Sequence, residues 1–132
     1  MTIRFAHRGL NTLAPENTLA AFEQLPKHDV KWLETDLGIT SDQHVVVLHD
    51  DYLDRTTNGS GLLTATTFAD VQKLSAGAWF GAEFADERVP TLADLVAFLN
   101  RTQTNANIEL KAVVGANANE LADELRRSLL QP

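Results

Sequence analysis

Residues 31–51 read KWLETDLGITSDQHVVVLHDD, and this stretch decides the fold that the rest of the chain supports. Its first half is rich in strand-forming residues and carries Glu34 and Asp36 two positions apart. Side chains alternate along a strand, so both carboxylates project from the same face. Like charges repel and lose hydration near a core, which costs free energy unless a cation or hydrogen bonds compensate. The alternative is a solvated strand face without function, the commoner outcome for an isolated Glu-x-Asp.

The second half of this stretch is a further apolar run, residues 45–48, which ends in His49. A hairpin that turns at Asp42 and Gln43 places Asp36 opposite His49, and such partners lie about 4.5–5.5 Å apart at Cβ. The turn lacks the Asn-Gly signal that fixes a register, and a slip of one residue would weaken the pairing. We nevertheless expect the hairpin, and with it a cluster of two carboxylates and one imidazole.

Composition is typical of one globular domain with a real core. The chain has 132 residues, of which 44% are hydrophobic and 22% charged, and its formal net charge is −7. This acidic balance argues against a nucleic-acid or anionic-membrane surface, although local cations or a metal ion can still create a phosphate site. The absence of cysteine excludes disulfides, thiolate zinc sites and cysteine nucleophiles. No signal peptide and no apolar run of roughly 20 residues is visible, so we expect a cytoplasmic protein without a membrane anchor.

The order of the expected elements predicts an α/β fold. A short strand at residues 3–6 precedes a helix that Asn17 or Thr18 caps and that Pro26 ends, and the strand at residues 32–39 follows. Strand, helix and strand in this order form a βαβ unit, which is typical of a parallel sheet or barrel.

The second half of the chain combines long irregular segments with helices and one more strand. The expected elements are an irregular segment at 50–65, a short helix capped by Thr67, an irregular segment at 77–90, a helix capped by Thr91, a turn at 105–107, a strand at 108–111 and a helix at 116–130. Loops of this length usually carry function or cover a site.

Ionisable residues stand at or near the ends of the expected strands. They are His7, Arg8, Glu34, Asp36, His49, Glu109 and Lys111. Since the carboxyl ends of parallel strands line the ligand site of such folds, we expect these side chains to converge. Three carboxylates suit a hard cation, Mg²⁺ or Ca²⁺, and the arginine and lysine can hold a phosphate. Two histidines can divide acid and base work, so the set favours phosphodiester cleavage over acyl transfer.

Each of these residues alone has a structural explanation, such as an ordinary ion pair of the arginine or the lysine with a neighbouring carboxylate. Together, however, seven segments resemble the glycerophosphodiester phosphodiesterase family. They are Ala6-His7-Arg8-Gly9, Pro15-Glu16-Asn17-Thr18, Glu34-Thr35-Asp36, His49-Asp50, residues 54–59, Pro90-Thr91-Leu92 and Glu109-Leu110-Lys111. The resemblance implies a TIM-barrel-like fold of the phospholipase C-like phosphodiesterase type. It also implies hydrolysis of glycerophosphodiesters to glycerol 3-phosphate and an alcohol.

The resemblance further implies a divalent-cation cofactor. In that family, the positions that match Glu34, Asp36 and Glu109 bind the cation, and Glu16 matches a supporting position near the metal or the His7 loop. Residues 51–88 resemble the family's characteristic insertion after the early strands.

The catalytic and phosphate-binding positions are matched as well. The resemblance implies that His7 and His49 serve as acid and base, in either order. It also implies that Arg8 and Lys111 hold the phosphate of a small-molecule glycerophosphodiester.

Length is the one large departure, because an α/β barrel typically needs about 200–250 residues. We expect residues 1–132 to be the N-terminal part of such a domain, either as a fragment or with a barrel that another chain completes. Exposed sheet edges would then favour self-association. Two alternatives remain: a phospholipase C- or D-like enzyme acting on lipids, and a truncated, inactive domain that binds a metal.

Overall fold

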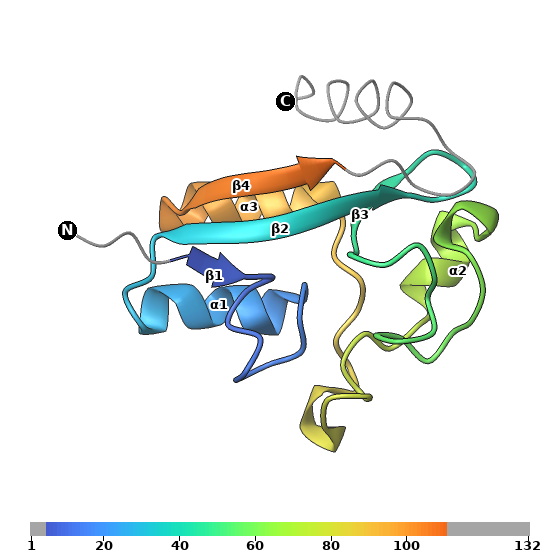
Figure 1. The fold of residues 1–132 in the computed structure, drawn as a ribbon, viewed down its shortest axis with the longest axis horizontal. Helices are drawn as coiled ribbons and strands as arrows, with labels where there is room; N and C mark the ends of the chain where they lie inside the picture. The colour runs from blue at the N-terminus through green and yellow to red at the C-terminus, as the bar shows by residue number, and fades with distance from the viewer. Residues whose placement is uncertain (1–4, 111–132) are drawn as a thin grey trace.

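The computed structural model describes residues 5–110, which form a four-stranded sheet covered on one face by helices. The central strand is β2 (Trp32–Ile39). It pairs in parallel with β1 (Phe5–His7) and β4 (Asn105–Leu110), and antiparallel with β3 (Val45–Val47). The three parallel strands point the same way, so their carboxyl ends meet at one end of the sheet (Figure 1). This arrangement confirms the predicted α/β class with a parallel sheet.

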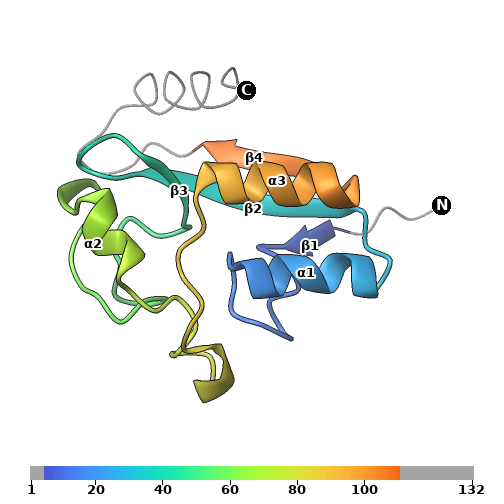
Figure 2. The same cartoon turned by 180° about the vertical axis from the view of Figure 1, so that it is seen from behind.

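Two long helices pack against the same face of the sheet (Figure 2). Helix α1 (Leu19–Lys27) is capped by Thr18, whose Oγ1 accepts a hydrogen bond from the Ala21 N–H, and it ends one residue beyond Pro26. Helix α3 (Leu92–Thr102) begins with a full capping box, as predicted. Phe22 of α1 and Phe98 of α3 contact each other with ring centroids 5.7 Å apart, above the sheet residues of the main core.

The segment between β3 and α3 is irregular, as expected, and lies below β3 in the view of Figure 1. It contains the short helix α2 (Phe68–Gln72), with its predicted Thr67 cap, and two 3₁₀ turns, η1 (Leu63–Ala65) and η2 (Ala82–Phe84). A second apolar cluster holds this segment against β3. Its buried members are Val46, Leu48, Leu53, Leu63, Val71, Ala76 and Val89.

The predicted hairpin is present, but its predicted register is wrong by one residue. Leu37 pairs with Val47, so Asp36 lies opposite Leu48, whose N–H donates to the Asp36 carbonyl oxygen at 3.2 Å. The loop has three residues instead of two, because Gln43 adopts a left-handed conformation with φ of 65°. Three-residue hairpin loops typically end in such a residue, and the extra residue moves every later pair by one. His49 therefore follows the residue opposite Asp36.

The predicted turn at residues 105–107 is also wrong, because β4 already begins at Asn105. Trp32 and Asn105 are register partners, so β4 pairs with β2 from the first residue of both strands. Tertiary pairing overrides the weak strand propensity of asparagine and alanine here. The predicted final helix, 116–130, lies outside the described residues. Among residues 5–110, none of the helices has the length and apolarity that crossing a membrane requires.

The position of Leu95 predicts a large loss of stability on truncation. Leu95 is fully buried between α3 and the sheet, so Leu95→Ala removes apolar contacts and leaves a cavity. We expect the free energy of unfolding to fall by about 2–5 kcal/mol, measured by urea denaturation. Leu13→Ala, at a residue 48% exposed, is the matched control and should stay within about 0.5 kcal/mol of the wild type. Equal losses in both variants would contradict the assigned core.

Candidate active site

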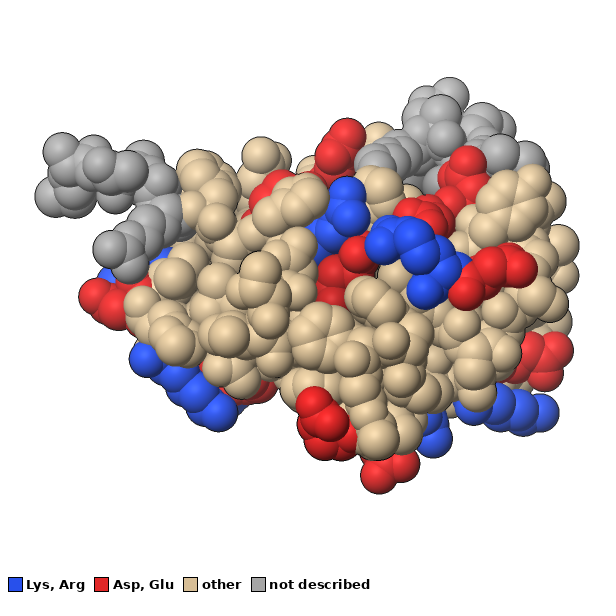
Figure 3. Space-filling view, turned by 60° about the horizontal axis from the view of Figure 1, so that its bottom comes forward, with Lys and Arg blue, Asp and Glu red and all other residues tan. Residues whose placement is uncertain are grey.

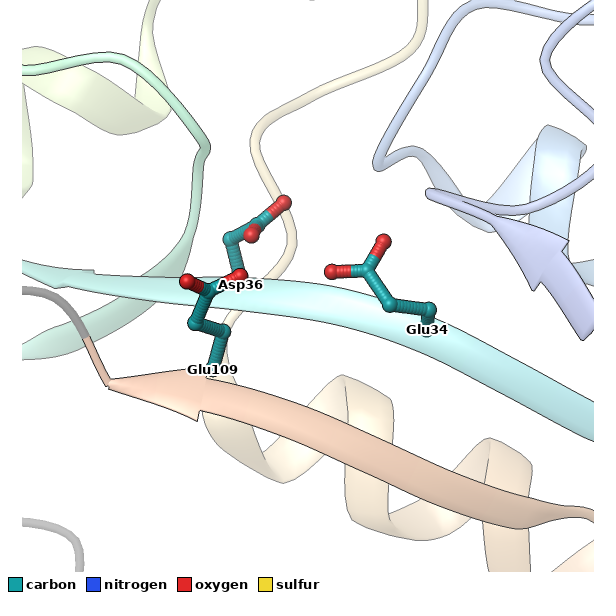
Figure 4. A group of neighbouring side chains, drawn as sticks. All are labelled: Glu34, Asp36 and Glu109. Atoms are coloured by element: carbon teal, nitrogen blue, oxygen red, sulfur yellow. The ribbon is translucent and has the colours of Figure 1, made fainter.

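Three carboxylates converge where the carboxyl ends of β1 and β4 lie beside the middle of β2. Glu34 and Asp36 project from the same face of β2, and strand register places Glu109 of β4 directly beside Asp36 (Figure 4). One carboxylate oxygen from each residue lies within 4.8 Å of the others. Asp36 is only 1% exposed, whereas Glu109 faces solvent. The structure thus brings together all three residues that the sequence predicted as metal ligands.

The electrostatics of this cluster favour the binding of a cation. Burial raises the pKa of Glu34, and the negative charge of Asp36 raises it further. Oε2 of Glu34 is buried and accepts no hydrogen bond from the residues that the structure describes. Three carboxylate oxygens at this spacing form a hard-ligand set of the kind that Mg²⁺ or Ca²⁺ prefers. The residues present therefore fit a divalent cation.

Asp36 is held in place by Asn17, a residue that the sequence suggested as a helix cap and as part of a family-like segment, but not as a site residue. Asn17 Nδ2 donates to Asp36 Oδ2 at 3.2 Å, and Asn17 Oδ1 accepts from the Thr35 hydroxyl at 2.8 Å. Because Thr18 caps α1, the side chain of Asn17 is available for the site. Asn17 is buried and left-handed, with φ of 53°, a conformation that asparagine tolerates better than most residues.

The chain leaves β1 through two left-handed residues, Arg8 with φ of 56° and Gly9 with φ of 85°. The Arg8 N–H donates to the Glu34 carbonyl oxygen at 2.6 Å, which keeps this turn on the sheet. A Cβ at position 9 would lie 2.6 Å from the Ala21 Cβ, so only glycine lets the turn approach α1 this closely.

This turn directs the His7 and Arg8 side chains toward the carboxylates. His7 Nε2 lies 3.3 Å from Glu34 Oε2, and Arg8 Nε lies 3.6 Å from Asp36 Oδ2. Arg8 Nη1 also donates to Glu16 Oε2 at 3.2 Å. Glu16 therefore contacts the His7 loop through Arg8, as one of the two predicted placements requires.

His49 is connected to this group through Asp50 and Arg55, which lie in the family-like segments of the sequence but were given no role there. Its Nδ1 lies 2.7 Å from Asp50 Oδ1, and Asp50 forms an ion pair with Arg55. Hydrogen bonds from Arg55 hold the pKa of Asp50 well below its usual range. The family-like segments His49-Asp50 and 54–59 were the available signal, but they did not indicate that Arg55 contacts Asp50 and Glu16, because loop conformation brings it back to the site.

The charged groups of this region lie against one another at the protein surface. Figure 3 shows acidic and basic side chains interleaved in the upper half of the view, next to a largely uncharged surface. Of the eight predicted site residues, Lys111 alone lies outside the described residues, so its phosphate contact stays a prediction.

Comparisons with known proteins agree with this geometry. A model of the glycerophosphoryl diester phosphodiesterase family matches residues 7–131. The chain is 41% identical over 111 residues to the glycerophosphodiester phosphodiesterase of Caldanaerobacter subterraneus subsp. tengcongensis, covering 84% of this chain and 46% of that protein.

Solved structures give the same result. A phosphodiesterase of Oleispira antarctica, in complex with the product sn-glycerol-3-phosphate, superposes with a TM-score of 0.79 at 41% identity, covering 81% of this chain and 43% of the other. A glycerophosphodiester phosphodiesterase of Agrobacterium tumefaciens gives a TM-score of 0.81 at 33% identity, covering 98% and 62%. The chain thus spans about half the length of these proteins, and its described residues form part of a TIM-barrel-like fold. By sequence and by structure, the chain belongs to the glycerophosphodiester phosphodiesterase family.

Proposed function

We propose that the chain takes part in the metal-dependent hydrolysis of glycerophosphodiesters to glycerol 3-phosphate and an alcohol. The observation that carries this proposal is the triad of Glu34, Asp36 and Glu109, with an imidazole and a guanidinium beside it. A relative bound to sn-glycerol-3-phosphate supports the same substrate class.

The three carboxylates are the proposed ligands of one divalent cation, Mg²⁺ or Ca²⁺. When bound, the cation polarises the phosphate and offsets the charge that develops during cleavage. Arg8 adds a planar guanidinium at the edge of this cluster, where it can also donate to a phosphate oxygen. Lys111 follows Glu109 and Leu110 in the sequence and is the second proposed phosphate ligand.

The proposed acid and base are His7 and His49. One imidazole removes the proton from the nucleophile, either water or the glycerol hydroxyl next to the phosphate. The other donates a proton to the leaving alkoxide as its bond to phosphorus breaks. If the glycerol hydroxyl attacks, water opens the cyclic phosphodiester in a second step and the imidazoles exchange roles. Both orders of acid and base are compatible with this scheme.

The remaining assignments are also part of the proposal. Residues 1–132 are the N-terminal part of a glycerophosphodiester phosphodiesterase domain, and residues 51–88 are an insertion within it. In the described part of the chain, the strands β1 and β4 each pair only with β2, so their outer edges are the proposed surfaces for self-association. The cytoplasmic location stays a prediction.

Metal binding can be tested without any substrate. Glu34→Gln removes one anionic ligand, so we expect the affinity for Mg²⁺ or Ca²⁺ to fall by about tenfold or more. Calorimetric titration of the EDTA-treated chain measures this change. Glu83→Gln, at an exposed glutamate of the η2 turn, makes the same chemical change elsewhere and should bind like the wild type. Wild-type affinity in Glu34→Gln would refute the proposed metal ligands.

Catalysis is tested with glycerophosphocholine and the release of glycerol 3-phosphate. We expect His7→Ala and His49→Ala to lower turnover by about 10²–10⁴-fold or more, because each removes a group that transfers a proton. EDTA should abolish turnover, and Mg²⁺ or Ca²⁺ should restore it.

His28→Ala is the matched control, because His28 is exposed at the end of α1. Wild-type turnover in either site variant would refute its catalytic role. Metal binding without turnover in the wild-type chain would instead favour an inactive metal-binding domain.

A further inference from the structure

We infer that Arg55 positions the proposed catalytic imidazole of His49. Its single guanidinium holds two carboxylates, those of Asp50 and Glu16. The inference rests on the proposed function and adds to it a residue from the irregular segment between β3 and α3. Arg55 donates hydrogen bonds to Asp50 and Glu16, and it acts through these two acidic partners.

The guanidinium of Arg55 forms two bidentate ion pairs. Its Nε and Nη2 donate to Asp50 Oδ2 and Oδ1 at 2.8 and 2.9 Å. Its Nη1 and Nη2 donate to Glu16 Oε1 and Oε2 at 2.8 and 3.1 Å. Only the planar fork of arginine can satisfy two carboxylates at once in this way, since lysine is a single point charge.

The first carboxylate leads to His49. The hydrogen bonds from Arg55 keep Asp50 ionised by lowering its pKa, although partial burial acts in the opposite direction. An ionised carboxylate can only accept, so the 2.7 Å contact requires His49 Nδ1 to donate its proton to Asp50 Oδ1. The neutral imidazole then has its lone pair on Nε2, and this nitrogen exchanges a proton with the substrate.

The second carboxylate leads to the metal-binding cluster. Glu16 Oε2 accepts from Arg8 Nη1 at 3.2 Å, and Arg8 Nε lies 3.6 Å from Asp36 Oδ2. Opposite charges therefore alternate in an unbroken series from Asp50 to Asp36. Arg55 is the member of this series that joins the His49 loop to the strand ends, across 39 residues of sequence from Glu16.

The arrangement has two consequences, one for stability and one for side-chain order. The Arg55 side chain is 46% exposed, whereas that of Glu16 is 9% exposed. Ion pairs with an exposed partner contribute little to stability unless they are bidentate or form a network, and both conditions hold here. The same bidentate geometry fixes the orientation of the two carboxylates.

The test compares Arg55→Gln and Arg55→Lys with the wild-type chain and with Arg88→Gln. Arg88 is an exposed arginine of the same segment that reaches only backbone carbonyls among residues 5–110, so its change is the matched control. The first readout is ¹⁵N NMR of the histidine rings without metal or substrate, with His49 identified by its loss in His49→Ala. We expect the wild type and Arg88→Gln to show the Nδ1–H form of His49. Both Arg55 variants should show a mixture of the two tautomers.

The second readout is steady-state hydrolysis of glycerophosphocholine. We expect kcat to fall by about tenfold to a hundredfold in Arg55→Gln, with KM within about twofold of the wild type. Losses of this size are typical when a residue that orients a functional side chain by hydrogen bonding is removed. Arg55→Lys should recover little of the loss, because it restores the charge without the fork. Thermal unfolding shows whether each variant is folded. If one Arg55 variant does not fold, the other Arg55 variant is compared with the wild type.

Unchanged His49 resonances in a folded Arg55 variant would overturn the inference. A raised KM with unchanged kcat would also overturn it, since Arg55 would then contact substrate. Full rescue by Arg55→Lys would overturn it as well, since the charge without the fork would then suffice. If the wild-type chain hydrolyses nothing, the proposed function fails for this chain, while the NMR comparison still decides whether Arg55 orients His49.

Discussion

Parallel pairing of β2 with β4 is the interaction on which the site depends. It sets Asp36 beside Glu109 as register partners, and Glu34 lies two residues earlier on the same face. This pairing concentrates negative charge on one face of the sheet. Helices α1 and α3 cover the opposite face. Such an arrangement is unfavourable by itself, because burial and mutual repulsion both disfavour ionised carboxylates. The apolar core on the helical face holds the strands together in spite of this cost, and the proposed cation would offset it.

The turns around this charged end are under backbone constraint. Arg8 and Asn17 are two of five non-glycine residues with positive φ among the described ones, and they hydrogen-bond to each other through the Asn17 N–H and the Arg8 carbonyl oxygen. Left-handed conformations at residues other than glycine cost free energy and persist where surrounding structure holds them, often at functional sites. Here the constraint directs the side chains of Arg8 and Asn17 toward Asp36. At these two positions the strain lies where orientation matters for the proposed chemistry, whereas Asp29, Gln43 and Gln103 adopt positive φ elsewhere.

Ion pairs extend this organisation from the strands into the irregular segment. Arg8 and Arg55 each contact two carboxylates, and Glu16 is shared between them. Burial opposes the ionisation of Glu16, but both arginines outweigh it and keep its pKa below the usual range. A segment without long helices or strands is thereby tied to the sheet by charge as well as by its own apolar cluster. Its loops are consequently part of the site and not only a cover over the core.

Residue types and their spacing were enough to predict the class of fold and the convergence of the three carboxylates. Alternation along a strand puts Glu34 and Asp36 on one face in any sheet, and helix caps such as Thr91 act within a few residues of sequence. Two predictions failed. The hairpin register was moved by the left-handed Gln43 within the loop, a conformation that the residue type does not require, and the start of β4 is set by pairing with the distant Trp32.

Only the tertiary structure showed the roles of Asn17 and Arg55. Each acts through a hydrogen bond to a residue far along the chain, Asn17 to Asp36 and Arg55 to Glu16. Local sequence determines what a strand or a helix end can present, because those geometries repeat over two to four residues. Which groups meet across loops depends on how the whole chain packs, and no short pattern encodes that.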